Sequence, residues 1–190
     1  MAEVFVVIDG QWHTCAASSK PRPDAWAFPV GDADYPPARW YCATWHSPKG
    51  ELNRNNYKHT GVDLNLDETP WGDVERTLGL SVSALAFGVV HFVTQNWYGN
   101  PMVVIRHEHE GAPLYVRYAH IVPVVKVGET VYAGTKLGPF ANWRTGDHLH
   151  LDMATAPYTT VWFPAGMMNP VPILELHLGT GPVAEMLAKG

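Results

Sequence analysis

Short apolar segments separated by polar and turn-forming residues recur through most of the chain, and this pattern predicts β-strands. A first strand-like run covers residues 4–8. Five later segments are rich in Val, Ile, Tyr or Phe and bounded by Gly, Pro or Asn, at spacings typical of an antiparallel all-β domain. We expect a mainly β fold, built as an antiparallel β-sheet or sandwich. The five segments are Ala86–Thr94, Met102–His107, Leu114–Ile121, Val131–Leu137 and His148–Met153.

Helices are expected to be few and short. The best candidates are residues 72–78 and 182–189, where Pro182 suits the first position of a helix. After its first strand, the segment 1–50 becomes rich in proline and tryptophan. Because proline fixes φ and lacks an N–H donor, this part should form turns and short edge strands over a core. We expect a single domain over residues 1–190, with 1–50 as an accessory lobe or wrap.

Composition narrows the class of protein. Hydrophobic residues make up 46% of the sequence and charged residues 16%, as in a soluble globular chain and unlike a disordered one. The net charge is −5 and no Lys/Arg cluster is visible, which argues against a nucleic-acid partner, because such partners require phosphate neutralisation. The start lacks a basic segment followed by a long apolar run, and no stretch of about 18 apolar residues occurs. We therefore expect neither a signal peptide nor a membrane span.

The two cysteines, Cys15 and Cys42, do not make a disulfide framework, and neither belongs to a C-x-x-C pair. A bridge between them would tie the N-terminal segment to the chain before the histidine motifs. We favour free, buried thiols, but the sequence leaves both states open.

Histidines form two motifs that could carry chemistry. His59 is followed four residues later by Asp63, and His148 is followed two residues later by His150. Residues i and i+2 of a strand share a face, so both members of the second motif can face a site while Leu149 packs into the core behind them. With ten histidines in the chain, each motif alone is weak evidence, and capping or surface roles are the simpler alternative.

A second H-x-H pair, His107 and His109, has a different setting. It lies among Arg106, Glu108 and Glu110, at a charged strand end that leads into a turn. We expect these two imidazoles to be exposed and solvated.

The residue types fit a zinc site. Catalytic zinc takes three protein ligands and keeps a fourth position for water, and imidazole nitrogen with carboxylate oxygen is a suitable set. His59, Asp63 and His150 would supply it. His148 and His120 would lie close by, and imidazoles can accept and donate protons there because their ordinary pKa is near neutrality.

The order of these motifs resembles that of the lysostaphin-type, or LytM-domain, zinc metalloendopeptidases, which cleave the peptide part of bacterial cell walls. The resemblance covers residues from about 50 to 175. The matching elements are His59–Asp63 for H-x-G-x-D, Gly88–Val90 for G-x-V, Val103–His107 for a middle strand, Tyr118–Ile121 for Y-x-H-L, Val127–Gly138 for a glycine-punctuated hairpin, Thr145–Asp152 for T-G-x-H-L-H-F-E, and the closing Asn169-Pro170.

The resemblance implies Zn²⁺ on His59, Asp63 and His150, in a groove of the sheet, with His120 and His148 as the catalytic pair. It leaves open which histidine is the base. It also implies a peptidoglycan peptide as substrate and action at the cell wall. Without a signal peptide, the protein would be released by lysis, a phage system or a secretion apparatus.

The sequence departs from the family pattern at several places. Asp152 stands where the family usually has Glu; its carboxylate could still accept a hydrogen bond from a ligand histidine and fix its tautomer, with shorter reach. The segment between Asp63 and Gly88 is longer than usual. Four tryptophans precede the zinc motif and could line a groove or fill a core, and core is the simpler expectation. They are Trp12, Trp26, Trp40 and Trp45.

Other functions remain open at this point. A catalytically inactive LytM-like binding or regulatory module of the cell envelope would keep the fold and lose the ligands, all of which are present here. A biotinyl- or lipoyl-type carrier could use the hairpin 127–138, but Lys126 and Lys136 lack the tight turn that such a carrier needs. A carboxypeptidase or amidase would keep the zinc and cut a different bond.

Overall fold

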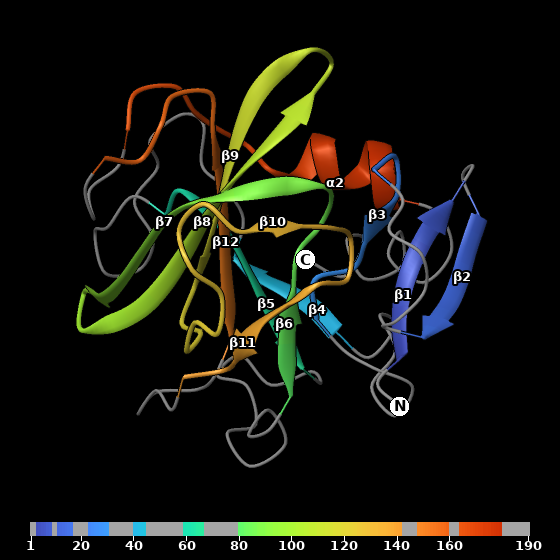
Figure 1. The fold of residues 1–190 in the computed structure, drawn as a ribbon, viewed down its shortest axis with the longest axis horizontal. Coiled ribbons are helices and arrows are strands. Elements are labelled where there is room, and N and C mark those ends of the chain that lie inside the picture. The colour runs from blue at the N-terminus through green and yellow to red at the C-terminus, as the bar shows by residue number, and fades with distance from the viewer. Residues whose placement is uncertain are drawn as a thin grey trace.

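The computed structural model describes residues 3–8, 11–16, 23–30, 40–44, 59–66, 80–141, 148–159 and 164–179. Strands dominate this part of the chain, which confirms the expected mainly β, antiparallel architecture (Figure 1). The strands are β1 Glu3–Ile8, β2 Gln11–Ala16, β3 Trp26–Ala27, β4 Trp40–Thr44, β5 Gly61–Leu66, β6 Ser81–Ser83, β7 Gly88–Trp97, β8 Asn100–His109, β9 Ala112–Ala119, β10 Thr130–Val131, β11 Lys136–Pro139, β12 Leu149–Ala154 and β13 Met167–Met168, and the helix is α2 Val171–Leu178.

The main sheet has the strand order β10-β7-β8-β9-β12-β5-β4, with β13 paired to β12. Two-residue turns connect β7 to β8 and β8 to β9. Both residues of each turn, Tyr98-Gly99 and Glu110-Gly111, have positive φ. This is the type I′ arrangement, whose twist matches that of the flanking strands, so the order β7-β8-β9 follows from local turn chemistry.

Residues of the central strands alternate between two faces of this sheet. In β12, Leu149, Leu151 and Met153 join a large core cluster with Val62 and Leu64 of β5. The residues between them point to the other face, where a smaller cluster forms. That second face carries His150 and Asp152 of β12, together with Asp63 of β5. The smaller cluster consists of Trp97, Met102, Val104, Tyr115, Ala119, Ala154 and Tyr158.

A separate three-stranded sheet, in the order β2-β1-β3, lies to one side of the main sheet (Figure 1). Val7 and Trp26 of this sheet belong to the large core cluster, and Ala27 N donates to Leu85 O at 2.7 Å. Strand β4 extends the main sheet beyond β5. The described N-terminal strands thus share the core, while the division into a core of about 50–175 and an accessory segment 1–50 stays a prediction.

Two expectations about secondary structure are wrong. The segment 131–137 is not one strand, because it contains the end of β10 and the start of β11. These two strands do not pair with each other as the hairpin expected over 127–138 would require: β10 pairs with β7, and β11 pairs with β6. Between them the chain turns at Gly134, with φ +79° and a hydrogen bond from Thr135 N to Tyr132 O at 2.9 Å. A glycine in the left-handed region favours such a turn over a continuous strand.

The helix α2 was not expected. Its buried residues Val171, Leu174 and Leu178 recur at the spacing of one helix face, and the Asn169 side chain accepts a hydrogen bond from Val171 N at 3.0 Å. Proline in the first turn, here Pro172, is compatible with a helix because its missing N–H would have no partner there. The predicted helices at 72–78 and 182–189 lie outside the described residues. Within the described ranges, no helix is long and apolar enough to cross a membrane.

Candidate metal centre

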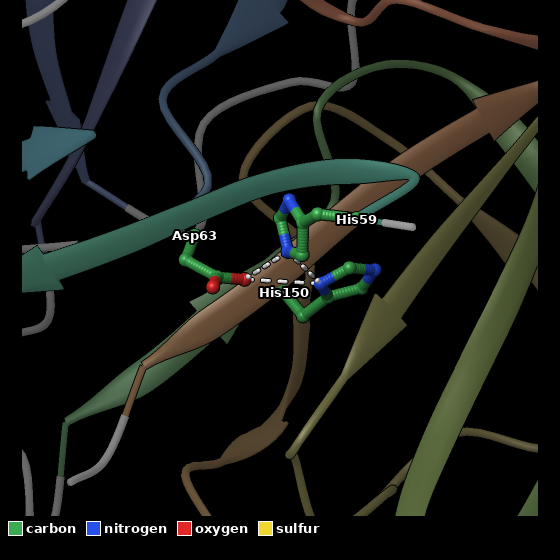
Figure 2. A group of neighbouring side chains, drawn as sticks. All are labelled: His59, Asp63 and His150. Atoms are coloured by element: carbon green, nitrogen blue, oxygen red, sulfur yellow. Dashed lines mark hydrogen bonds and ion pairs between the residues drawn. The ribbon is translucent and has the colours of Figure 1, made fainter. Parts of the chain in front are cut away.

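The candidate metal centre lies where β5 and β12 run side by side. The two strands pair antiparallel, and their register places His150 opposite Asp63. His59 lies two residues before β5, and its side chain turns back over the strand toward Asp63 (Figure 2). Residues distant in sequence therefore meet on one face of the sheet.

Three side-chain atoms form a nearly equilateral triangle. His59 Nε2 lies 3.1 Å from Asp63 Oδ1 and 3.1 Å from His150 Nδ1, and His150 Nδ1 lies 3.0 Å from Asp63 Oδ1 (Figure 2). His150 is nearly enclosed, whereas the side chains of His59 and Asp63 are 15% and 18% exposed. His59 and Asp63 are therefore the more exposed members of the triangle.

This donor set fits zinc. Ligand atoms that bind tetrahedral zinc at about 2.0–2.1 Å are separated by roughly 3.4 Å, so the edges of the triangle need to open by only a few tenths of an ångström. Two imidazole nitrogens and one carboxylate oxygen are also the ligand types of a catalytic zinc centre with an open position. Among the described residues, these three are the group that could hold a metal ion.

Gly61 lets the two strands approach. A β-carbon at this position would collide with the backbone oxygen of Leu151 and would lie 2.8 Å from the β-carbon of Asp152. Any side chain would push β5 away from β12 and separate Asp63 from His150. The middle glycine of the H-x-G-x-D motif is therefore a requirement of close strand packing.

His120 and His148 complete a cluster of five residues. Nε2 of His148 lies 3.6 Å from Asp63 Oδ1, and its ring lies 4.6 Å from the ring of His120. His120 follows β9 with φ +65°, a left-handed conformation that is uncommon for a residue other than glycine. Its backbone is held there by hydrogen bonds from His120 N to Pro101 O and from Ala141 N to His120 O. The structure brings together all five residues that the sequence singled out.

The charges of the cluster are strongly coupled. Burial alone would raise the pKa of Asp63, but the nearby His148 and hydrogen bonds with His150 and His59 hold that pKa well below its ordinary value. Burial, followed by the neighbouring His148 and His150, holds the pKa of His120 well below 6.5. Burial opposes a positive charge on His150 as well, yet hydrogen bonds to Asp152 and Asp63 raise its pKa to about 9. Before a metal binds, His150 thus carries a positive charge at neutral pH.

A second layer of side chains surrounds His150. Its Nε2 lies 3.1 Å from Oδ2 of Asp152, a carboxylate with no exposed surface. Arg117 pairs with the same carboxylate, and the Tyr158 hydroxyl donates to it. Burial would raise the pKa of Asp152, but Arg117 first, and then His150, lower it to about 2. The sequence pointed to Asp152 alone; Arg117 and Tyr158 were missed.

The expectation that His107 is exposed is wrong. It is 1% exposed, its Nδ1 donates to Phe87 O at 2.9 Å, and its Nε2 lies 3.2 Å from the Tyr118 hydroxyl. Burial lowers the pKa of His107 to about 4, partly opposed by the bond to Phe87. His109 is half-buried, and its Nδ1 lies 3.2 Å from Nε2 of His177, which stacks on Trp26.

Comparison with solved structures agrees with the fold. The catalytic domain of the antimicrobial peptidase lysostaphin from Staphylococcus simulans is 22% identical, with a TM-score of 0.55 over 73% of this chain and 95% of that chain. The catalytic domain of a mutant of the prophage-encoded M23 protein EnpA from Enterococcus faecalis is 20% identical, with a TM-score of 0.51 over 70% and 89% of the two chains. A Ruminococcus gnavus protein with the name lytM is 20% identical, with a TM-score of 0.52 over 79% and 59%. No curated protein matches the chain in sequence.

Fold and site together define a mainly β protein of the lysostaphin type, with a candidate centre for one metal ion on one face of its sheet. The match in sequence covers more than half of the chain. The chain belongs to peptidase family M23, whose family profile matches residues 57–160.

Proposed function

We propose that this chain is a zinc-dependent endopeptidase that hydrolyses peptide bonds in the cross-links of bacterial peptidoglycan. The observation that carries the proposal is the triangle of His59 Nε2, Asp63 Oδ1 and His150 Nδ1, with edges of 3.0–3.1 Å and two further histidines beside it. Membership of peptidase family M23 supports the reaction class.

The three atoms of the triangle would hold the zinc ion. Zinc bound there would lower the pKa of a water molecule toward neutrality and polarise the scissile carbonyl. Asp63 is suited to this role because its low pKa keeps it ionised at neutral pH. His150 would release its Nδ1 proton on binding, so metal affinity should fall as the pH is lowered.

His148 and His120 would handle the protons of the reaction. His148 is the more accessible of the two, with 21% of its side chain exposed, and its Nε2 lies 3.6 Å from Asp63 Oδ1. His120 is buried with a lowered pKa, so it is neutral near pH 7 and keeps one ring N–H donor and one ring acceptor. One ring can take the proton of the attacking water, while the other stabilises the oxyanion or protonates the leaving amine.

The cell wall is the proposed place of action. This follows from the peptidoglycan substrate, and release could occur by lysis, a phage system or a secretion apparatus. The overall charge of −5 indicates that wall binding would not depend on broad attraction to anionic wall polymers.

The test combines metal content with hydrolysis of purified cell walls. We expect about one zinc per chain in the unmodified protein, loss of zinc and activity in His150→Ala, and retained zinc without activity in His148→Ala. His13→Ala provides a matched control, because this histidine is exposed on β2 and lies outside the site. It should keep both zinc and activity.

Two results would contradict the proposal. Full zinc and full hydrolysis in both site variants would show that the residue assignments are wrong. Zinc binding without hydrolysis in the unmodified protein would favour the alternative, an inactive wall-binding module. The released products separate the remaining zinc hydrolases: an endopeptidase opens cross-links internally, whereas an amidase releases the peptide stem from the sugar.

A further inference from the structure

We propose that Arg117 and Tyr158 are positioning residues for the metal centre. They hold the Asp152 carboxylate so that His150 keeps its proton on Nε2 and offers the lone pair of Nδ1 to the metal. This inference rests on the proposed zinc function and adds residues to it that never touch the ion.

The Asp152 carboxylate is surrounded by donors. Its Oδ1 accepts from the Tyr158 hydroxyl, and its Oδ2 accepts from Arg117 Nη2, from Thr60 Oγ1 at 3.2 Å and from His150 Nε2 at 3.1 Å. Asp152 and Arg117 have no exposed surface, and Tyr158 is 1% exposed. Hydrogen bonds from these four donors, one of them the charged guanidinium of Arg117, favour an ionised carboxylate that can only accept.

An acceptor at this position decides which nitrogen of His150 carries a proton. Because Asp152 can only accept, His150 Nε2 must be the donor in their contact. The other nitrogen, Nδ1, is the one that lies 3.0–3.1 Å from Asp63 Oδ1 and His59 Nε2. If Asp152 were displaced, the proton could move to Nδ1, where it would occupy the direction that the metal needs.

Arg117 is fixed by more than its charge. It lies directly opposite Asp152 in the pairing of β9 with β12, so the ion pair is built into the register of the sheet. Its guanidinium lies 4.5 Å from the ring centre of Trp97 and 5.0 Å from that of Tyr158. Cation–π contacts with these two rings stabilise the position of the charged group. The Trp97 ring also packs 5.2 Å from the ring of His150, so one side chain supports both ends of the network.

The test is a conservative substitution with a matched control. Tyr158→Phe removes the hydroxyl that donates to Asp152. As the control, Tyr118→Phe removes a hydroxyl of a similarly buried tyrosine that contacts Leu85 N and His107 instead. Zinc dissociation constants are measured by competition with a chelator, alongside thermal unfolding. We expect Tyr158→Phe to weaken zinc binding about 3- to 10-fold, less than the 10- to 100-fold typical of losing a direct partner of a ligand histidine, and Tyr118→Phe to leave it within about twofold.

Asp152→Asn and the nitrogen signals of His150 give a second readout. The asparagine variant should weaken zinc binding more than Tyr158→Phe. In the zinc-loaded unmodified protein, long-range ¹H–¹⁵N spectra should show His150 protonated at Nε2 and bound through Nδ1.

Each result then has a definite meaning. Equal zinc affinity in the two tyrosine variants, or a metal-bound Nε2 on His150, would overturn the positioning role while the proposed function stands. Absence of zinc binding by the unmodified protein would instead overturn the proposed function, and the positioning role with it.

Discussion

The buried His107 predicts a specific dependence of stability on pH. Its ring is 1% exposed, and burial lowers its pKa from 6.5 to about 4. Between pH 6.5 and pH 4, His107 is protonated in the unfolded chain but neutral in the folded chain. The free energy of unfolding therefore decreases as the pH falls from 6.5 toward 4, and His107 has no effect above about pH 7.5.

The magnitude follows from the size of the pKa shift. One pKa unit corresponds to about 1.4 kcal/mol, so complete titration would cost roughly 3 kcal/mol. Most of this loss occurs early: between pH 7.5 and pH 5 it amounts to about 2 kcal/mol. Such a loss is a large part of the stability of an ordinary domain.

His107→Gln isolates this effect. Glutamine can still donate to Phe87 O and accept from the Tyr118 hydroxyl, the two bonds that His107 makes, but it does not titrate. Urea unfolding of both metal-free proteins at pH 7.5, 6 and 5 should show that the variant loses about 2 kcal/mol less than the unmodified protein over this range. The other titrating groups are present in both proteins, so their contributions cancel. The same pH slope in both proteins would refute the buried, neutral state of His107.

Three further predictions concern the site and the N-terminal sheet. Gly61→Ala should lower stability by about 1–3 kcal/mol and reduce zinc content, because a β-carbon at this position collides with the backbone oxygen of Leu151. Thermal unfolding and metal analysis test this, and a variant of unchanged stability would contradict it. His120→Ala should retain zinc and lower the rate of wall hydrolysis by roughly 100-fold or more, measured as turbidity loss; unchanged hydrolysis would remove it from catalysis. Trp26→Ala should lower stability by about 3 kcal/mol and increase hydrogen exchange in α2, because the ring of Trp26 stacks on that of His177 with 3.8 Å between the ring centres. Unchanged protection of the α2 amides would contradict a role of this contact in holding α2.

Local signals explain which parts of the fold the sequence could predict. Strands β7, β8 and β9 were expected because each segment is rich in Val, Ile, Tyr or Phe, and the turns between them carry glycine where φ is positive. The partners of β10 and β11 were not predictable in this way. These two strands lie close in sequence, but each pairs with a strand more than 40 residues earlier, so their pairing depends on long-range packing.

The burial of His107 could have been predicted from its position in β8, but its charged neighbours in the sequence pointed to an exposed site. Along β8, Val103, Ile105 and His107 share the face that packs into the large core, while Arg106 and Glu108 are exposed. Strict alternation places His107 inside. The charged neighbours suggested a solvated strand end, but the strand continues to His109 before it turns.

The five histidine and aspartate positions could be selected from sequence because spacing and motif order identify them, but the network behind them could not. Arg117 and Asp152 are 35 residues apart, and only the pairing of β9 with β12 makes them neighbours. The same strand β12 sets His150 opposite Asp63 of β5. A slip of β12 by one residue would turn His150 and Asp152 to the core face and bring Leu149 and Leu151 to the site. The burial of those leucines therefore opposes such a slip, and the apolar side of β12 fixes the geometry of its chemical side.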